Sequence, residues 1–507
     1  MGTGAVLQLD GRRRALLTVS VMMASMLQAI DTTIANVALP RIQGSMSATQ
    51  DQMAWVLTSY IVAVAIATPV VGWLAGQIGR RRVFLFSIAG FTATSLLCGL
   101  AQSLPQIVVT RLLQGLSGAA LIPMSQAVML DAYPPARQAR AMTLWVMGTV
   151  MGPIIGPALG GWLTESYDWR WVFFINLPVG VLAWLGVAGS LPETTTPRSR
   201  FDAFGFVALS LGVGALQLLL DRGQRNDWFE SRETWIEATI AAVTLYGFFV
   251  HMLTAPRPPF ISPALFRDRN FVTGNVLVFV IGVVLFATLA LLPTLMQDLL
   301  AYPVVTAGMI MAPRGMGTLS AMLIVGRLIA RLGVRPTVGI GMLLTAVSLW
   351  QMSGFDLQMG AASFVWAGAL QGLGVGLVYA PLAPLAFATL KPALRNEGTA
   401  LFNLARNVGS SIGISVVESL LVRKTQLLHA RLAEHLSPYE TATRSALAGT
   451  FAGPHGLAGL NAWVTRQAAM IAYTNDFKLM MLLTLASMPL LLLLRPGAHA
   501  SEAVAVE

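Results

Sequence analysis

The chain has 507 residues, of which 55% are hydrophobic and only 11% are charged. Its mean hydropathy of +0.68 excludes an ordinary soluble globular protein and indicates a polytopic membrane protein. The formal net charge of +10 does not predict nucleic-acid binding, because the arginines lie between apolar runs, where membrane topology explains them. A single cysteine, Cys98, excludes a disulfide framework within the chain and a thiolate metal cluster.

Apolar runs of about 20 residues recur along the chain, and each is long enough to cross a bilayer as a helix. The first run follows Arg12, Arg13 and Arg14 and continues past signal-peptide length, so it is interpreted as a retained helix. The expected helices lie at 15–37, 54–75, 83–102, 106–128, 141–163, 172–190, 202–220, 236–254, 271–295, 304–325, 337–354, 362–388, 399–420 and 477–494. These fourteen spans predict an all-α polytopic membrane protein with both termini on one side.

Positive charges indicate which side that is. Lys and Arg concentrate in the connections on the side of the N-terminus, for example at Arg80, Arg81 and Arg82. Since cytoplasmic loops carry an excess of Lys and Arg, both termini are expected to be cytoplasmic.

Two sequence stretches recur in the second half of the chain. G-W-L-A-G-Q-I-G at 72–79 returns as G-R-L-I-A-R-L-G at 326–333, and Q-G-L-S-G-A-A-L-I-P at 114–123 returns as Q-G-L-G-V-G-L-V-Y-A-P at 371–381. The repeated helices run in the same sense, as in transporters built from two parallel repeats. This predicts a six-helix bundle at 1–190, two inserted transmembrane helices at 191–255, a second six-helix bundle at 256–494 and a cytoplasmic tail at 495–507.

The second bundle is expected to contain a long periplasmic loop at 421–476. Apolar periodicity at 422–436 and 457–471 favours amphipathic helices on the membrane surface, and a docking surface for a partner is the alternative. His429 and His435 are six residues apart and do not share a helix face, so no metal site is predicted.

Asp31 lies within the first expected helix, in the stretch Q-A-I-D-T-T-I-A-N-V-A-L-P. An ionised side chain near the centre of a membrane helix costs about 2.5–3.5 kcal/mol, so such residues tend to be functional. Asp31 lies roughly 24 Å from the inner end of its helix and Arg111 roughly 8 Å from the outer end of its own, which places them at similar depth in a core of about 30 Å. A carboxylate that meets an arginine in one conformation and not in another can couple proton binding to movement. The alternatives are a hydrated Asp31 near the outer interface and an ion pair that only tethers helices.

The stretch 148–161, G-T-V-M-G-P-I-I-G-P-A-L-G-G, combines small residues with helix breakers. A membrane helix tolerates such residues, because small side chains let a neighbouring helix approach closely. The regular spacing predicts a functional bend in a tightly packed helix rather than an ordinary packing face. Its residues are Gly148, Gly152, Pro153, Gly156, Pro157, Gly160 and Gly161.

Two further groups of residues are assigned less specifically. The first is either a cytoplasmic gate loop or a plain topogenic cluster, and it consists of Gly72, Gly79, Arg80, Arg81 and Arg82. Arg314, Arg406 and Glu418 could line a cavity, attract an anionic substrate or pair internally.

These motifs resemble the major facilitator superfamily, and most closely its fourteen-helix drug:proton antiporter branch with the EmrB-type export permeases. D-T-T-I-A-N-V-A-L-P at 31–40 resembles the first-helix motif of that branch, R-L-L-Q-G-L-S-G-A at 111–119 its fourth-helix arginine motif, and 148–161 the antiporter motif of helix five. Y-P-P-A-R at 133–137 and W-R-W-V-F-F-I-N-L-P at 169–178 are similar to segments of the EmrB type. The resemblance implies proton coupling by Asp31 and Arg111, and export favoured by helix five.

The chain departs from the family pattern at one point, and the resemblance also implies partner proteins. Gly76 and Gln77 stand where the superfamily's loop motif has an acidic residue followed by a basic one, which puts the usual charge network of that gate in question. In Gram-negative members of the EmrB type, a periplasmic adaptor and an outer-membrane channel complete the pump.

Together these features predict a proton-coupled antiporter in the bacterial inner membrane that exports hydrophobic or amphipathic small molecules by alternating access. An exporter dedicated to one metabolite or toxic aromatic acid is the alternative within the same class. The sequence has no HExxH, GxSxG or P-loop motif, so neither an enzyme nor ATP drive is expected. The proton gradient is the expected driving force, with no cofactor. A channel is disfavoured by Asp31.

Overall fold

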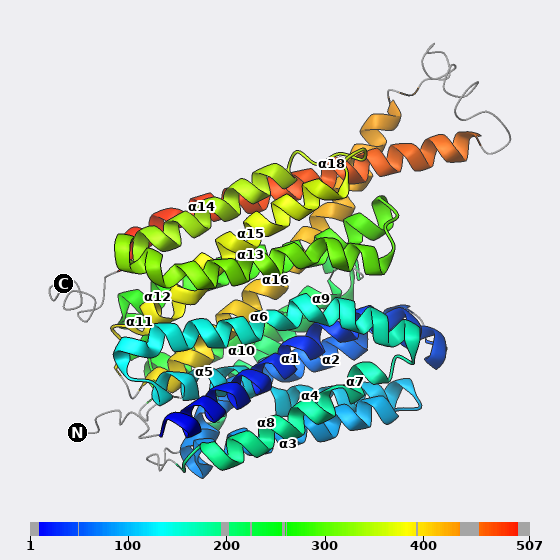
Figure 1. Cartoon of the computed structure of the whole chain (residues 1–507). Helices are drawn as coiled ribbons and strands as arrows, with labels where there is room; N and C mark the ends of the chain where they lie inside the picture. Colours follow the sequence, from blue (N-terminus) through cyan, green and yellow to red (C-terminus); the bar gives the residue numbers. More distant parts are fainter. Residues whose placement is uncertain are drawn as a thin grey trace.

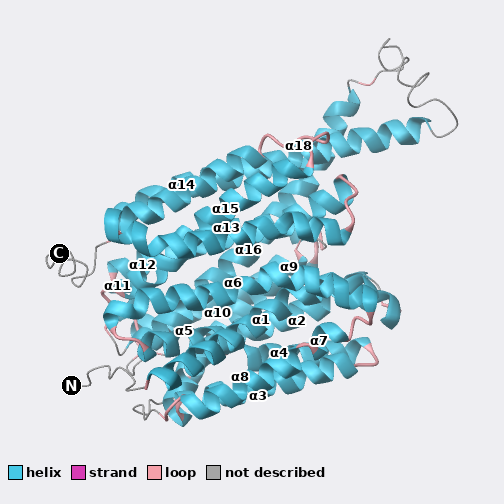
Figure 2. Ribbon diagram, viewed as in Figure 1, coloured by secondary structure: helices cyan, strands magenta, loops and turns pink. Residues whose placement is uncertain are grey.

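The computed structural model describes residues 10–48, 50–193, 202–223, 226–255, 259, 261–391, 394–434, 436 and 456–494. These residues form long helices joined by short turns, and none of them lies in a strand (Figure 2). The long helices run side by side, and both ends of the described chain lie at the same end of the bundle (Figure 1). We call that end, where α1 begins at Gly11 and the last helical turn ends at Leu493, the terminal face.

The first half of the bundle contains α1 (Gly11–Met46), α2 (Gln50–Ile78), α3 (Arg80–Leu100), α4 (Leu104–Gly118), α5 (Leu121–Ala132), α6 (Pro135–Ser166), α7 (Trp171–Phe174) and α8 (Asn176–Ser190). Two further long helices follow, α9 (Ala203–Arg222) and α10 (Arg232–Thr254), with a 3-10 turn at Trp228–Glu230 between them. The second half contains α11 (Ala264–Arg267), α12 (Arg269–Thr294), a π-helical turn at Leu295–Leu299, α13 (Val304–Leu332), α14 (Val334–Met352), α15 (Ala361–Phe387), α16 (Arg395–Glu434), α18 (Gly456–Ser487) and a 3-10 turn at Met488–Leu493.

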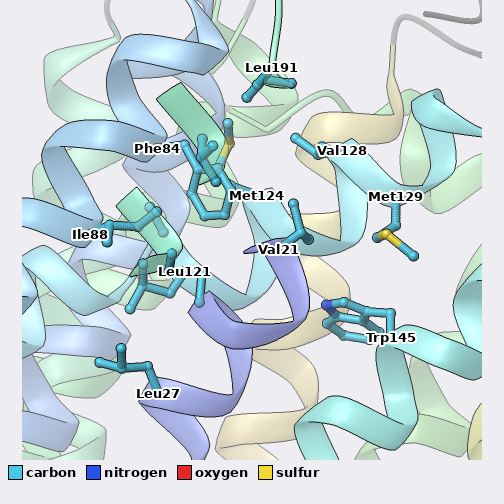
Figure 3. Packing of buried hydrophobic residues seen from close by; sticks show 14 of the residues in the cluster. Val21, Leu27, Phe84, Ile88, Leu121, Met124, Val128, Met129, Trp145 and Leu191 are labelled. Carbon is cyan, nitrogen blue, oxygen red and sulfur yellow. The ribbon is translucent and has the colours of Figure 1, made fainter. Parts of the chain in front are cut away.

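Each half has its own apolar core. In the first half, side chains of α1, α3, α5 and α6 meet around Met124 and Trp145 (Figure 3). In the second half, α12, α14, α15 and α18 enclose another cluster, which includes Leu291, Leu349 and Phe477. Since lipid is as apolar as these side chains, close packing rather than exclusion of water holds such helices together.

Helix breakers are accommodated inside several of these helices. Pro69 lies within α2, Pro313 within α13, and Pro381 and Pro384 within α15. Neighbouring helices can satisfy the backbone groups that proline leaves unpaired in a membrane helix.

The pair α9 and α10 packs beside both halves. On α9, Asp221 accepts a hydrogen bond from Thr58 of α2, and Gln217 accepts one of 2.8 Å from Ser411 of α16. The guanidinium carbon of Arg222 lies 4.8 Å from the ring centre of Trp55. The pair therefore spans the junction between α2 and α16.

Among the described residues, eleven helical segments are long and apolar enough to cross a membrane, which makes this a multi-pass membrane protein. The expected spans at 141–163, 337–354 and 399–420 fall on α6, α14 and α16, which are not among the eleven. The count of fourteen spans therefore stays a prediction.

Within the expected long loop at 421–476, the structure confirms helix over the described parts of the two stretches expected to be helical, 422–436 and 457–471, but shows them as continuations of longer helices. Residues 421–434 continue α16 without a break, and residues 456–476 are the first part of α18, so the described part of this segment is helix in line with the bundle helices. Residues such as Leu, Arg, Gln and Ala extend these helices because they carry little intrinsic cost in a helix. We call 421–434 and 456–476 the projecting pair, and the end of the bundle that carries it the hairpin face (Figure 1). His435 and residues 437–455 lie outside the described residues.

Candidate functional site

Asp31 and Arg111 meet inside the first half of the bundle. Asp31 lies in the middle of α1 and its side chain is fully buried, and that of Arg111 on α4 is 1% exposed. Arg111 Nη1 lies 2.6 Å from Asp31 Oδ2. The structure thus places the two predicted residues in direct contact, away from the surface of the bundle.

Two neutral side chains complete the shell of Asp31. Gln114 Nε2 and Asn176 Nδ2 each donate a hydrogen bond of 3.0 Å to Asp31 Oδ1. The carboxylate therefore accepts three hydrogen bonds, one of them from a cation.

Arg111 is held from several directions. Its Nε donates to the Val56 carbonyl oxygen at 3.2 Å and its Nη1 to Gln114 Oε1 at 2.8 Å. The guanidinium carbon lies 4.2 Å from the ring centre of Tyr60 and 5.8 Å from that of Phe173. Contacts over aromatic faces and to a carbonyl fix the plane of the guanidinium, so the pair with Asp31 has a single geometry.

Asn176 reaches the site from the start of α8, directly after α7. Ile175 between the two helices keeps helical backbone angles, with φ −60° and ψ −24°, and Pro178, which has no N–H, follows in the first turn of α8. Ser95 of α3 donates to the Phe173 carbonyl oxygen at 2.9 Å and accepts from Asn176 Nδ2 at 3.0 Å. Asn176 and Gln114 were not predicted, because an uncharged amide inside a membrane helix is a weak signal, although both lie within motifs noted above.

Two more polar groups lie buried in this region. Tyr60 Oη and Gln28 Oε1 are both buried, and the two side chains interact with each other. Breaking a buried pair by removing one partner costs about 3–5 kcal/mol, so loss of either side chain of the Asp31–Arg111 pair would destabilise this region.

The glycine stretch of α6 packs directly on the part of α1 that carries Asp31. A Cβ added at Gly152 would lie 2.6 Å from the Ala29 backbone carbon, and one added at Gly156 would overlap Thr33 Oγ1. At Gly160 the nearest atom is Ile34 Cγ1 at 2.7 Å. At the ends of the stretch an added Cβ has more room. It would lie 3.2 Å from the Met22 side chain at Gly148 and 4.0 Å from Val37 Cγ1 at Gly161. The side chains of Pro153 and Pro157 lie outside the described residues, while α6 runs through both positions.

The predicted gate loop is a sharp connection between α2 and α3. Gly79 has a φ of 91°, which favours glycine, and separates α2, which contains Gly72, Gly76 and Gln77, from Arg80. Arg80 pairs with Asp131 at the end of α5. The other two arginines contact the last turn of α8 and Glu193, which follows α8.

Arg81 donates to the Ala188 carbonyl oxygen at 2.6 Å, and Arg82 Nε lies 3.6 Å from a Glu193 carboxylate oxygen. The predicted gate loop therefore has a charge network without an acidic residue at position 76, and its carboxylates are Asp131 of α5 and Glu193, which follows α8.

Arg314, Arg406 and Glu418 are not brought together with Asp31. Arg314 on α13 is 6% exposed, donates to the Leu285 carbonyl oxygen at 3.3 Å, and has a buried Nη1 without a hydrogen-bond partner among the described residues. Arg406 on α16 donates to Tyr379 Oη at 2.6 Å. Glu418 lies on the exposed side of α16.

The sequence matches the family described as the Major Facilitator Superfamily over residues 21–414. The chain belongs to this superfamily. Two relatives with functional names are the fatty acid resistance protein FarB of Neisseria gonorrhoeae, 35% identical over 97% of this chain and 98% of FarB, and the multidrug export protein EmrB of Escherichia coli K12, 34% identical over 85% of each chain.

The solved structures of the superfamily include a similar fold. The human organic anion transporter MFSD10 superposes with a TM-score of 0.60, covering 93% of this chain and 99% of its own, at 13% sequence identity. At this low identity the likeness concerns the fold alone, and it agrees with the two packed helical halves. Superfamily membership therefore rests on the sequence matches, and the fold is consistent with it.

Proposed function

We propose that this chain is a proton-coupled antiporter that exports hydrophobic or amphipathic small molecules by alternating access. The observation that carries the proposal is the buried pair of Asp31 and Arg111, whose side chains are 0% and 1% exposed. The printed names of its relatives support the substrate class, since EmrB and EmrY of Escherichia coli are named as multidrug proteins. The driving force is the proton gradient, without a cofactor.

In this proposal, Asp31 alternates between two states. While ionised, it is held by Arg111, Gln114 and Asn176 as described above. A proton that reaches Asp31 removes the attraction for Arg111, so the pair opens and the tightly packed α1 and α6 can shift. Release of that proton on the other side of the membrane restores the pair, which ties one conformational cycle to proton movement.

We place the protein in the bacterial inner membrane with both termini in the cytoplasm. The support is the arginine cluster Arg80, Arg81 and Arg82 at the terminal face, since cytoplasmic loops are rich in Lys and Arg. The hairpin face then lies in the periplasm, the side from which protons enter.

The test is substrate-induced proton release from acid-loaded everted vesicles, read with a pH dye across lipophilic cations, weak acids and neutral drugs. Asp31→Asn should abolish the signal, because the amide cannot bind and release a proton. Asp168→Asn is the matched control, since Asp168 is 49% exposed, and it should retain wild-type activity. Full proton-driven efflux by Asp31→Asn at equal protein levels would contradict the proposal.

A second candidate function is export dedicated to one amphipathic acid. Arg314 favours it, because a buried guanidinium with an unfilled donor can bind a carboxylate strongly, and the relative FarB is named for fatty acid resistance. Adding a long-chain fatty acid and its uncharged alcohol to the panel separates the candidates. A response to the acid alone, lost in Arg314→Gln, would favour the dedicated exporter, and responses to several unrelated drugs favour the multidrug exporter.

We further propose that the projecting pair contacts a periplasmic adaptor, which connects the transporter to an outer-membrane channel. The support is that the far ends of the pair extend past the neighbouring helices (Figure 1) and that they carry apolar exposed residues, such as Leu427, Leu457 and Trp463, which are 53%, 73% and 47% exposed. Replacing these three by serine should abolish co-purification with an adaptor while proton-linked transport in vesicles persists. Unchanged co-purification would exclude this surface.

A further inference from the structure

A second carboxylate is buried in the other half of the bundle. Asp476 on α18 has a side chain that is 0% exposed. Its Oδ1 accepts a hydrogen bond of 3.2 Å from Lys424 Nζ on α16, whereas its Oδ2 is buried and has no hydrogen-bond partner in the described part of the chain. The expected loop ended at this residue, so its burial was not predicted.

Asp476 is held less completely than Asp31. The carboxylate of Asp31 accepts from three donors in a closed site, while that of Asp476 accepts one hydrogen bond from a lysine that is 31% exposed. Leaving a buried acceptor unsatisfied costs about 1–3 kcal/mol, and more when it is charged. Lys424 reaches solvent, so the one cation that favours the ionised form of Asp476 in the described contacts can turn away into water.

The titratable groups around Asp476 are of both signs. Asp298 in the π-helical turn and Glu418 on α16 lie within electrostatic range of Tyr473, as Asp476 itself does. The cations on the same two helices include Arg423 and Lys424 on α16 and Arg466 and Lys478 on α18. The helices α12 and α14, which also pack on α18, each carry a single titratable residue, Arg269 and Arg335, both within the first two residues at the terminal face. Among the described residues, Lys424 is the one cation in contact with the Asp476 carboxylate.

The surroundings of Asp476 include an irregular helix. Tyr473 donates to Thr294 Oγ1 at 3.1 Å, next to the π-helical turn Leu295–Leu299, and Arg466 donates to the Leu299 carbonyl oxygen at 2.8 Å. Such turns inside α-helices are frequent at functional sites. By helical rise, Asp476 and Asp31 both lie roughly 30 Å from the terminal face, so the two carboxylates occupy similar levels in opposite halves.

We propose that Asp476 is a second proton-binding site, loaded from the hairpin face during the transport cycle. The inference rests on the proposed proton antiport. In the loading step, Lys424 keeps its own proton and turns to water, and the Asp476 carboxylate takes one proton from that water. The net charge of the site rises by one, and the proton leaves when Lys424 returns to the carboxylate.

Infrared difference spectra of the full-length purified protein test proton binding without a substrate. We expect a protonated-carboxyl band to grow on acidification from about pH 8 to about pH 5, and Asp476→Asn to remove part of it. In Lys424→Gln, the share of the band that belongs to Asp476 should titrate with a midpoint at higher pH, because the cation that favours the ionised carboxylate is gone. Arg423→Gln is the matched control, since Arg423 is an exposed neighbour on α16, and its midpoint should stay in place.

Transport in proteoliposomes tests the use of the site. The number of protons exchanged per substrate should fall by about half in Asp476→Asn, and Asp476→Glu should restore it. If Asp476→Asn does not fold, the shift of the infrared midpoint in Lys424→Gln still tests whether Asp476 binds a proton. An unchanged band in Asp476→Asn, or an unchanged midpoint in Lys424→Gln, would overturn the site. If the wild type exchanges no protons with any substrate, the proposed antiport fails, and the infrared titration still reports on Asp476.

Discussion

Arg111 illustrates how much of the site depends on one side chain. Its guanidinium reaches Asp31, Gln114 and the Val56 carbonyl at once, with donor–acceptor distances between 2.6 and 3.2 Å. A lysine carries the same charge but only a single nitrogen, which cannot occupy these directions together. The geometry of the guanidinium, more than its charge, therefore orders the site.

We predict that Arg111→Lys lowers proton-driven efflux by at least about tenfold, since one hydrogen bond to a charged group contributes about 1.5–3 kcal/mol and 1.4 kcal/mol corresponds to a tenfold change. The measurement is the initial rate of dye efflux from energised cells at matched protein levels. The control is Arg170→Lys, because Arg170 is 35% exposed and lies 3.4 Å from Asp168 at the surface. Equal losses in both variants would show that the geometry at Arg111 is not special.

The sequence predicted the charged members of this site and missed the neutral ones. Asp31 and Arg111 are found because a charge inside an apolar run is costly, and their depths follow from counting helix residues. Asn176 reaches Asp31 because α8 packs beside α1 and α3, where Asn176 also donates to Ser95. Asp476 was missed because its burial depends on α16 continuing past the expected membrane boundary.

At the level of elements, the contact between α1 and α6 is the tightest part of the proposed mechanism. Gly152, Gly156 and Gly160 leave no room for a side chain against Ala29, Thr33 and Ile34. The approach also brings Thr33 Oγ1 to 3.4 Å from the Gly152 carbonyl oxygen. Any shift of α6 therefore moves the segment of α1 that carries Asp31.

We predict that Gly156→Ala destabilises the protein by about 1–3 kcal/mol, the usual cost of overpacking, and lowers transport. The added methyl group would overlap Thr33 Oγ1, which is tied to α1 by hydrogen bonds to Ala29 and Ile30. The measurement is thermal unfolding in detergent together with efflux. Gly161→Ala is the control, because its nearest atom is 4.0 Å away, and it should change neither. If both variants behave alike, the spacing of glycines on α6 has no packing role.

At the scale of elements, the sequence predicted which segments are helical better than how those segments are connected. Long apolar runs located the helices of both halves, because a bilayer span requires them. Apolar periodicity also predicted helices at 422–436 and 457–471, but not that they continue α16 and α18. They continue as helices beside each other, where His429 Nε2 lies 2.9 Å from Asn461 Oδ1.

For the whole molecule, the two halves meet across a buried amide contact near the terminal face. Asn403 Nδ2 of α16 donates to Gln126 Oε1 of α5 at 3.2 Å, and the two residues are 3% and 2% exposed. Met322 of α13 also packs into the core of the first half. Alternating access requires the halves to separate here when the terminal face opens, so this contact must break in every cycle.

We predict that a short bis-thiosulfonate link between cysteines at Gln126→Cys and Asn403→Cys abolishes transport and that a reducing agent restores it, because the link holds the halves together at the terminal face. Cys98 can remain, since it is fully buried. Each single-cysteine variant treated with the same reagent is the control and should stay active. Efflux that continues in the linked double variant would mean that the halves do not separate at this contact, and alternating access about the α5–α16 junction would have to be abandoned.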